Sequence, residues 1–213
     1  MGPAKTVIAA PFSENVIHSD EEGIQVEAKQ DYIKKLFPRV NDIKDVEIRE
    51  KVISLWWDAW KESKFAKIEH VSQWEPSREK LNMSNVEHTN QVVECAVAIA
   101  QVVDREQNIN VNMDTLIAAS ILHDADKILM FDPSTGDTTP LGTYLPHTGI
   151  AAHMAVQAGL PIDIVHAIAS HSPNYSSVPP KTIEAVILYN ADQIVTKTWT
   201  ISRNIDVSFD LKH

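Results

Sequence analysis

The sequence has 213 residues, of which 44% are hydrophobic and 23% are charged, as is usual for a globular protein of one domain with an added arm. A formal net charge of −10 argues against a surface for nucleic acids or anionic membranes, and one cysteine, Cys95, cannot form an internal disulfide. Apolar runs fall far short of the roughly 20 residues of a membrane-spanning helix, and no segment has the pattern of a secretory signal. We therefore expect a cytoplasmic protein that binds neither nucleic acid nor membrane.

Residues 1–80 are expected to form an N-terminal arm and a tryptophan-rich helix. Pro, Ser, Asp and Glu mix in residues 1–30, which predicts an extended arm, and a short helix over 31–40 should stop near Pro38. A longer helix is expected over 45–65. Its apolar residues recur at helical spacing, which favours packing in the core or at an interface over a binding platform for its tryptophans. These apolar residues are Val52, Trp56, Ala59 and Trp60.

The chain is helical in pattern through residues 81–200. The expected helices are 84–108, 112–131, 147–158, 161–171 and 182–196. Ser84 and Glu87 have the spacing of a capping box before the first of these, and Gly159 suits the position just after the third. Turn-forming residues predict loops over 132–146 and 172–180. Residues 201–213 form a tail in which alternating apolar residues predict a short strand or an arm: Ile205, Val207, Phe209 and Leu211.

The most informative residues are His123 and Asp124, which follow the apolar run 117–122 and are therefore directed toward the interior. A buried Asp beside a His is costly unless its charge is compensated, either by a structural ion pair or by a metal ion. Four further candidates each lie on a different expected helix or at a helix end: His88, His147, His171 and Asp192. Helices packed around one core can bring such groups together. Four imidazoles and two carboxylates suit Fe, Mn, Co, Ni or Zn, and do not suit Ca.

This pattern resembles the HD superfamily, the metal-dependent hydrolases named for their His-Asp doublet. The stretch Leu122-His123-Asp124-Ala125-Asp126-Lys127 is similar to the family's doublet turn. Gly159-Leu160-Pro161 with Ile168 and His171, and the pair Ala191-Asp192, are similar to further stretches of the family. The resemblance covers about 84–197. It implies an all-α fold, an HD-type helical bundle with additional N-terminal helices, and an HD-type metal-binding domain over 81–200.

The resemblance also implies how the candidates divide. One metal would be held by His88, His123, Asp124 and Asp192, and a second by His147 and His171 with Asp124 bridging the two ions. Lys127 is expected on the same helix face as His123 and Asp124, where the resemblance gives it the task of holding an anionic substrate group or a transition-state charge. The alternative for Lys127 is a salt bridge to Asp124 or Asp126. Asp126 either orients a ligand histidine or is a solvated carboxylate.

The favoured function is hydrolysis of a small phosphate ester or nucleotide at a mono- or dinuclear His/Asp site that holds one or two divalent ions. Asp124 and Lys127 are the expected catalytic residues, and the expected substrate is an anionic small molecule. The alternative is an HD-type mixed-valent diiron oxygenase that cleaves a C–C or C–P bond with O₂, because it shares the same ligands. A non-catalytic sensor or interaction module is a third hypothesis. The loops are expected to border the entrance, with Tyr144, Tyr175 and Lys181 as substrate contacts. The tryptophan-rich helix is a candidate for the pocket wall or for a homodimer contact.

Overall fold

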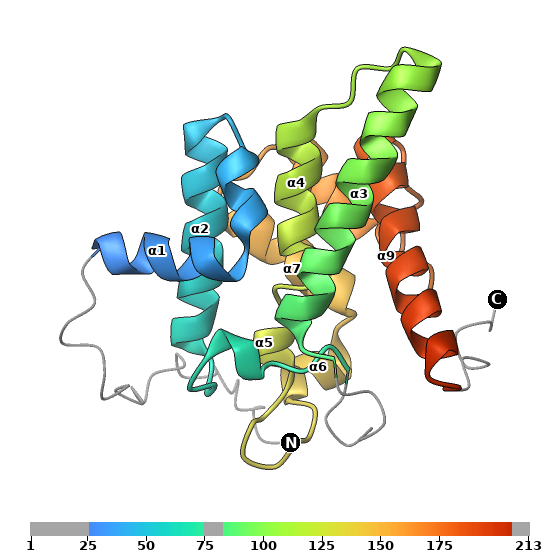
Figure 1. The fold of residues 1–213 in the computed structure, drawn as a ribbon. Helices are drawn as coiled ribbons and strands as arrows, with labels where there is room; N and C mark the ends of the chain where they lie inside the picture. The colour runs from blue at the N-terminus through green and yellow to red at the C-terminus, as the bar shows by residue number, and fades with distance from the viewer. Residues whose placement is uncertain (1–25, 75–82, 206–213) are drawn as a thin grey trace, which may run out of the picture.

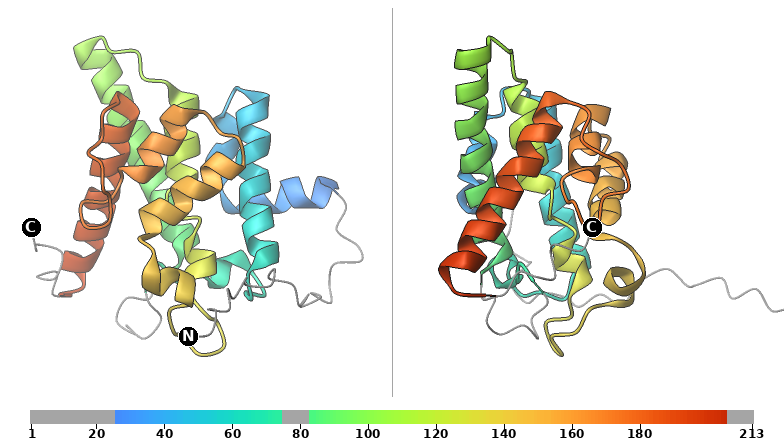
Figure 2. Two further views of the ribbon diagram at one scale, coloured as in Figure 1. Left: turned by 180° about the vertical axis from the view of Figure 1, so that it is seen from behind. Right: turned by 90° about the vertical axis from the view of Figure 1, so that its right-hand side faces the viewer.

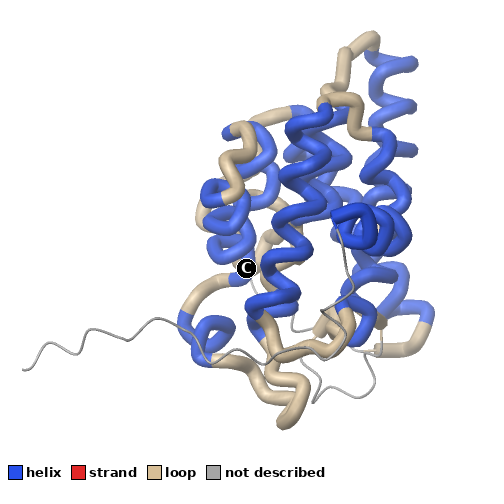
Figure 3. Tube along the Cα trace, turned by 90° about the vertical axis from the view of Figure 1, so that its left-hand side faces the viewer, coloured by secondary structure: helices blue, strands red, loops and turns tan. Residues whose placement is uncertain are grey.

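The computed structural model describes residues 26–74 and 83–205, and this part of the chain consists of helices joined by loops and turns, as Figure 3 shows. Two isolated β-bridges, Ser72–Ser84 and Phe131–Thr138, are the only strand-like pairings among these residues. The helices in chain order are α1 (Val26–Leu36), η2 (Pro38–Asp42), α2 (Val46–Glu62), η3 (Ile68–His70), α3 (Asn85–Gln107), α4 (Met113–Leu122), α5 (Lys127–Met130), α6 (Pro140–Tyr144), α7 (His147–Gln157), α8 (Ile162–Ala169) and α9 (Ile183–Ser202). The all-α prediction is confirmed.

Helix α4 occupies the centre of the bundle. Its residues 115–122 are all buried, so every face of this helix packs against protein. Helices α2 and α3 flank it, and α9 lies beside α3 (Figure 1). Seen from behind, the pair α7 and α8 covers the remaining side (Figure 2). The C-terminal end of α4, where the His-Asp doublet follows, is therefore surrounded by the other helices.

The N-terminal elements begin earlier than the sequence predicted. Helix α1 starts at Val26, so the expected extended arm over 1–30 is wrong for its last residues, while residues 1–25 lie outside the described part. The physical reason is that Ile33 and Leu36 pack into the core from this helix. The stop before Pro38 is confirmed, because a proline cannot continue the hydrogen-bond ladder. Helix α2 starts after Asp45, whose side chain caps it by accepting hydrogen bonds from the Glu47 and Ile48 backbone N–H groups.

The predicted continuous helix over 112–131 is also wrong. Helix α4 ends at Leu122, residues 123–126 form turns, and α5 follows at Lys127. Within the turns, Ala125 N donates to Leu122 O and Lys127 N donates to Asp124 O, so bonds over three residues replace the α-helical pattern. His123 and Asp124 lie in this break, and their side chains approach the same centre, with His123 Nε2 3.3 Å from Asp124 Oδ2.

Two expected loop regions differ in smaller ways. The loop over 132–146 contains the short helix α6, which Thr139 caps and Pro140 opens. Helix α9 runs on to Ser202, beyond the expected end at residue 196 and into the expected tail, because Val195, Trp199 and Thr200 are buried. Of the alternating tail residues, Val207, Phe209 and Leu211 lie outside the described part. The capping box at Ser84 and the left-handed Gly159, with φ of 67°, are confirmed.

One hydrophobic core joins the N-terminal helices to the rest. Trp56 of α2 is fully buried, and its ring stacks on Phe37 with centroids 4.8 Å apart. The Trp56 indole N–H donates to the Ile121 carbonyl over 3.1 Å, so α2 holds the last turn of α4 directly. No helix in the described ranges is long and apolar enough to cross a membrane.

Candidate metal centre

The structure brings together all six residues that the sequence analysis selected. His88 lies in the first turn of α3, and His123 and Asp124 follow the last residue of α4. His147 opens α7, His171 follows α8, and Asp192 lies in the middle of α9. All six are buried.

His88, His123 and Asp192 form the first part of the cluster with one oxygen of Asp124. The Nε2 atoms of His88 and His123 are 3.2 Å apart, and His88 Nε2 is 3.1 Å from Asp192 Oδ1. Asp124 Oδ2 lies 3.6 Å from His88 Nε2 and 3.3 Å from His123 Nε2. Ligands bound tetrahedrally at about 2.0 Å from one ion are separated by about 3.3 Å, so these spacings suit a shared ion.

His147 and His171 form the second part around the other oxygen of Asp124. His147 Nδ1 lies 3.3 Å from Asp124 Oδ1, and His171 Nε2 lies 3.7 Å from the same atom. The two oxygens of Asp124 therefore face different pairs of imidazoles. Two groups that could hold a metal ion share this carboxylate: His88, His123 and Asp124, and Asp124, His147 and His171.

Backbone carbonyls orient two of the imidazoles. His123 Nδ1 donates to Ser120 O over 2.8 Å, and His171 Nδ1 donates to Ile168 O over 2.6 Å. Because a carbonyl can only accept, Nδ1 of each ring carries a proton, and Nε2 is the ring atom that faces the cluster. This second hydrogen bond is the arrangement that fixes histidine ligands of metal ions.

The charge states at the centre suit a cation. Burial lowers the pKa of His88, and burial together with the His123 charge lowers that of His171 to about 3, so both rings are neutral. Burial would raise the pKa of Asp192, but the hydrogen bond from His88 outweighs it and keeps this carboxyl ionised. Asp124 is likewise ionised, because the Lys127 and His123 charges lower its pKa well below the usual value despite burial. Neutral imidazoles and ionised carboxylates are the forms that bind metals. His123 differs, because the Asp124 and Asp192 charges raise its pKa despite burial, so an ion bound there would displace its proton.

Two buried atoms at the shared carboxylate lack a hydrogen-bond partner among the described residues, Asp124 Oδ1 and His147 Nδ1. They are 3.3 Å apart, but their geometry is not that of a hydrogen bond. Buried polar atoms without partners are rare in native proteins and call for an explanation. A divalent ion between these atoms would satisfy both, so the residues present fit a metal.

Lys127 forms a salt bridge to Asp124, which the sequence analysis gave as the alternative to a contact with substrate. Its Nζ lies 2.8 Å from Asp124 Oδ2 and also donates to the Gln73 carbonyl over 2.8 Å. The side chain is 12% exposed and lines the pocket over the centre, so it neutralises Asp124 at the edge of the substrate space.

Gln73 is a residue that sequence reasoning missed. Its amide donates to Asp124 Oδ2 over 2.7 Å, and Asn85 Nδ2 donates to its Oε1 over 3.0 Å. The sequence carries no motif around Gln73, and the contact spans 51 residues of chain. The Ser72–Ser84 bridge and the hydrogen bond from Gln73 N to Met83 O hold this segment against the start of α3 and place Gln73 at the centre.

Asp126 is fully buried, and neither of its carboxyl oxygens has a hydrogen-bond partner among the described residues. Of the two readings of the sequence, the solvated carboxylate is therefore wrong. Burial, opposed in part by His147 and reinforced by Asp124, raises the pKa of Asp126 from 3.8 to about 7.

This raised pKa predicts how the stability of the metal-free protein depends on pH. Between about pH 4 and pH 7 the unfolded chain loses this proton while the folded chain keeps it, so stability falls as the pH rises through that window. Asp126→Asn stays neutral, and we expect it to raise the free energy of unfolding by about 1–3 kcal/mol at pH 8 and by almost nothing at pH 4. Urea unfolding of both proteins in chelator at the two pH values measures this. An equal difference at both would contradict the prediction.

A pocket of about 310 Å³ opens over the centre. Asp124, His147, His171 and Asp192 contribute to its wall, together with Tyr175, whose ring meets the His147 ring edge to face at 4.9 Å. The expected contact at Tyr175 thus lines the pocket. The other two expected contacts are wrong: Tyr144 is 82% exposed and Lys181 lies in the loop before α9, and neither lines the pocket. The short helix α6 carries the Tyr144 side chain outward to solvent.

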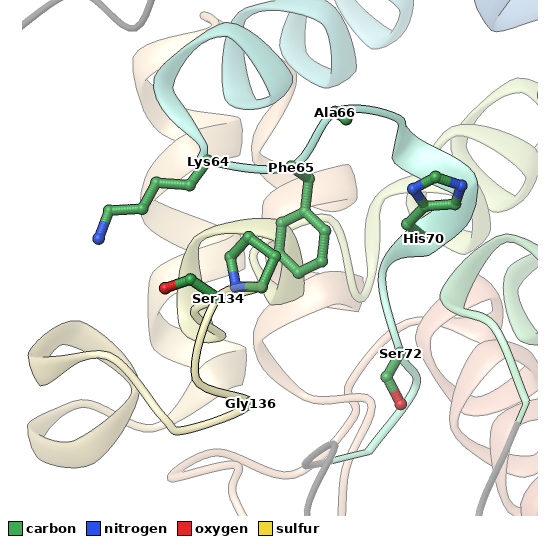
Figure 4. Close-up of a pocket in the computed structure, with 8 residues that line it drawn as sticks. Lys64, Phe65, Ala66, His70, Ser72, Ser134 and Gly136 are labelled. Atoms are coloured by element: carbon green, nitrogen blue, oxygen red, sulfur yellow. The ribbon is translucent and has the colours of Figure 1, made fainter.

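A larger hollow of about 490 Å³ lies elsewhere, between residues 64–72 and 133–136 (Figure 4). Phe65 and His70 line it, and Lys64 extends away from both in the close-up. Its described lining contains one imidazole and no carboxylate, so it lacks the groups for the chemistry discussed above. The smaller pocket over the His/Asp cluster is the candidate site.

Comparison with known proteins agrees with this geometry. The family model of the HD domain matches residues 85–196, which contain all six residues of the cluster. A curated relative, the dihydroneopterin 2',3'-cyclic phosphate phosphodiesterase of Methanocaldococcus jannaschii, is 27% identical over 174 residues, which cover 78% of this chain and 69% of the relative. No solved structure matches the chain.

Proposed function

This chain belongs to the HD domain family of metal-dependent phosphohydrolases, and on that premise we propose that it hydrolyses a small phosphodiester at a dinuclear metal centre. The observation that carries the proposal is the division of the cluster into two groups around the two oxygens of Asp124. The first ion would be held by His88, His123, Asp124 and Asp192, and the second by His147, His171 and Asp124. Fe, Mn, Co, Ni and Zn suit this set of donors.

Bound divalent ions would polarise a phosphoryl oxygen and acidify the attacking water. The chain's own residues prepare the site for this. Gln73 and Lys127 hold Asp124 Oδ2 at 2.7 Å and 2.8 Å, which keeps the shared carboxylate in one orientation. Lys127 also lies at the pocket edge, where its ammonium group can pair with a phosphoryl oxygen of the substrate.

The charges of the pocket favour a phosphodiester over more highly charged substrates. Lys127 is the only lysine or arginine among the described residues that line it, and this lysine already pairs with Asp124. A diester presents a single phosphoryl group to the ions and Lys127, whereas the further phosphates of a nucleoside triphosphate would meet no other basic side chain among the described lining residues. The volume of about 310 Å³ suits a small molecule. The relative's activity as a cyclic-phosphate phosphodiesterase supports the same class.

The diiron oxygenase alternative shares the six donors, so geometry does not separate the two reactions. The relative's activity favours hydrolysis. The two are distinguished by oxygen, because hydrolysis needs only water.

The test starts from protein stripped of metal by a chelator and then supplied with Mn, Co, Fe(II), Ni or Zn. We expect the metal to restore hydrolysis of 2',3'-cyclic nucleotides or of bis(p-nitrophenyl) phosphate, with a phosphomonoester as product. Diesters should exceed the matching monoesters in kcat/KM by roughly tenfold, a difference of about 1.4 kcal/mol. Turnover should be unchanged under strict anaerobiosis. A faster release of phosphate from monoesters would reject the diester assignment, and a product that requires oxygen would reject hydrolysis.

A further inference from the structure

Trp74 lines the pocket over the metal centre, and the side chains of Trp199 and Arg203 form a stack with its ring. Its ring stacks on Trp199 of α9 with centroids 4.9 Å apart and an angle of 29° between the planes. The Arg203 guanidinium lies 4.1 Å from the centre of the Trp199 ring. Met83 and Trp199 form a buried cluster against which Trp74 and Ile205 pack. The Trp74 ring is therefore held in a fixed orientation by the protein itself.

The two tryptophans differ in how far their side chains are buried. Trp199 is buried, whereas Trp74 is only partly buried and lines the pocket together with Asp124 and Lys127. A rigid indole in a pocket wall offers a flat apolar surface whose contact with a ligand costs little conformational entropy. Planar rings stack on such a surface whatever their hydrogen-bonding edge.

Gln73, the residue before Trp74, keeps the Trp74 ring near the metal centre. Gln73 donates to Asp124 Oδ2 over 2.7 Å, and its carbonyl accepts from Lys127 over 2.8 Å. Trp74 is thus one residue along the chain from a direct contact of the metal centre. A molecule that reaches both places carries its phosphate and its ring close together, as a nucleoside-sized molecule does.

We propose that Trp74 is the specificity-determining residue of the pocket and stacks on a planar heteroaromatic ring of the substrate. The inference deepens the proposed function and rests on it: the substrate class becomes a phosphodiester that carries such a ring. Two amide side chains, Asn174 and Gln193, also line the pocket and can donate to or accept from the edge of a heterocycle.

The kinetic test compares two cyclic phosphodiesters. Adenosine 2',3'-cyclic phosphate carries a planar heteroaromatic ring, and glycerol 1,2-cyclic phosphate carries none. For Trp74→Leu we expect KM for the adenosine diester to rise roughly tenfold or more relative to KM for the glycerol diester, with similar kcat for each. Trp74→Phe should restore most of the preference. Tyr144→Leu is the matched control, because this exposed aromatic residue lies outside the pocket wall. An equal change of both KM values, or none, would overturn the proposal.

A binding measurement separates this proposal from the proposed function. Adenosine, guanosine and a free pterin carry rings but no phosphodiester, and their binding to the metal-loaded protein is read from equilibrium dialysis. We expect at least one of them to bind the wild type and to bind Trp74→Leu roughly tenfold more weakly. If none of the three compounds binds, or if each binds both proteins equally, the stacking role of Trp74 is overturned even if diesters are hydrolysed. The predicted loss of binding would support it even if the hydrolytic activity is absent.

Discussion

Replacing His123 and Asp124 together by alanine is expected to lower kcat/KM by roughly a thousandfold or more and to remove the bound metal. His123 supplies one fully buried nitrogen to the first group. Asp124 is the only residue that belongs to both groups, and its loss leaves each with imidazoles but no shared carboxylate. Metal content per chain and kcat/KM for the diester, measured on the same preparation, test the expectation.

The control for this variant is His153→Ala. His153 lies on α7, as His147 does, but it is exposed and outside both groups. We expect this variant to keep its metal and its activity. Because the double substitution also leaves Lys127 without its carboxylate partner, circular dichroism and a thermal melt should confirm that the variant is folded. Unchanged metal content in a folded double variant would refute the assignment of the centre.

The six residues of the cluster could be selected from sequence because each lies at a spacing typical of a known family. His88, His123 and Asp192 are 35 and 69 residues apart along the chain, and no local pattern joins them. The doublet was visible because burial of a His-Asp pair after an apolar run needs compensation, and the other four residues followed from their positions on separate helices and from the family resemblance. The helices that carry them were predicted from periodicity, since α3, α7 and α9 each bury one face.

The break between α4 and α5 could not be predicted in the same way. Apolar residues continue at helical spacing from Leu116 to Phe131, so periodicity alone predicts one helix. The structure instead closes turns at residues 123–126, where His123 Nδ1 takes the Ser120 carbonyl as acceptor. Polar side chains that bond to the backbone compete with helix continuation, and this competition depends on the tertiary setting of the cluster.

The pocket wall was the least predictable part. Trp74 lies outside every predicted helix, and Trp199 lies beyond the predicted end of the last helix at residue 196. Their stacking joins residues 125 positions apart and depends on α9 continuing to Ser202. Loop composition favoured Tyr144 as a contact, but composition does not show which way a short helix such as α6 turns its side chains.

Trp56→Ala is expected to lower the free energy of unfolding by about 3–5 kcal/mol, because it removes a fully buried ring and leaves a cavity. It also leaves the Ile121 carbonyl without the indole N–H, two residues before His123, so metal affinity should fall as well. Trp56→Phe keeps part of the contact with Phe37 but loses the hydrogen bond and some buried ring volume, for which we expect a cost of about 2–3 kcal/mol. Urea unfolding and metal titration of both variants measure these effects. A loss below about 1 kcal/mol for Trp56→Ala would mean that the N-terminal helices do not support the end of α4 on which the centre depends.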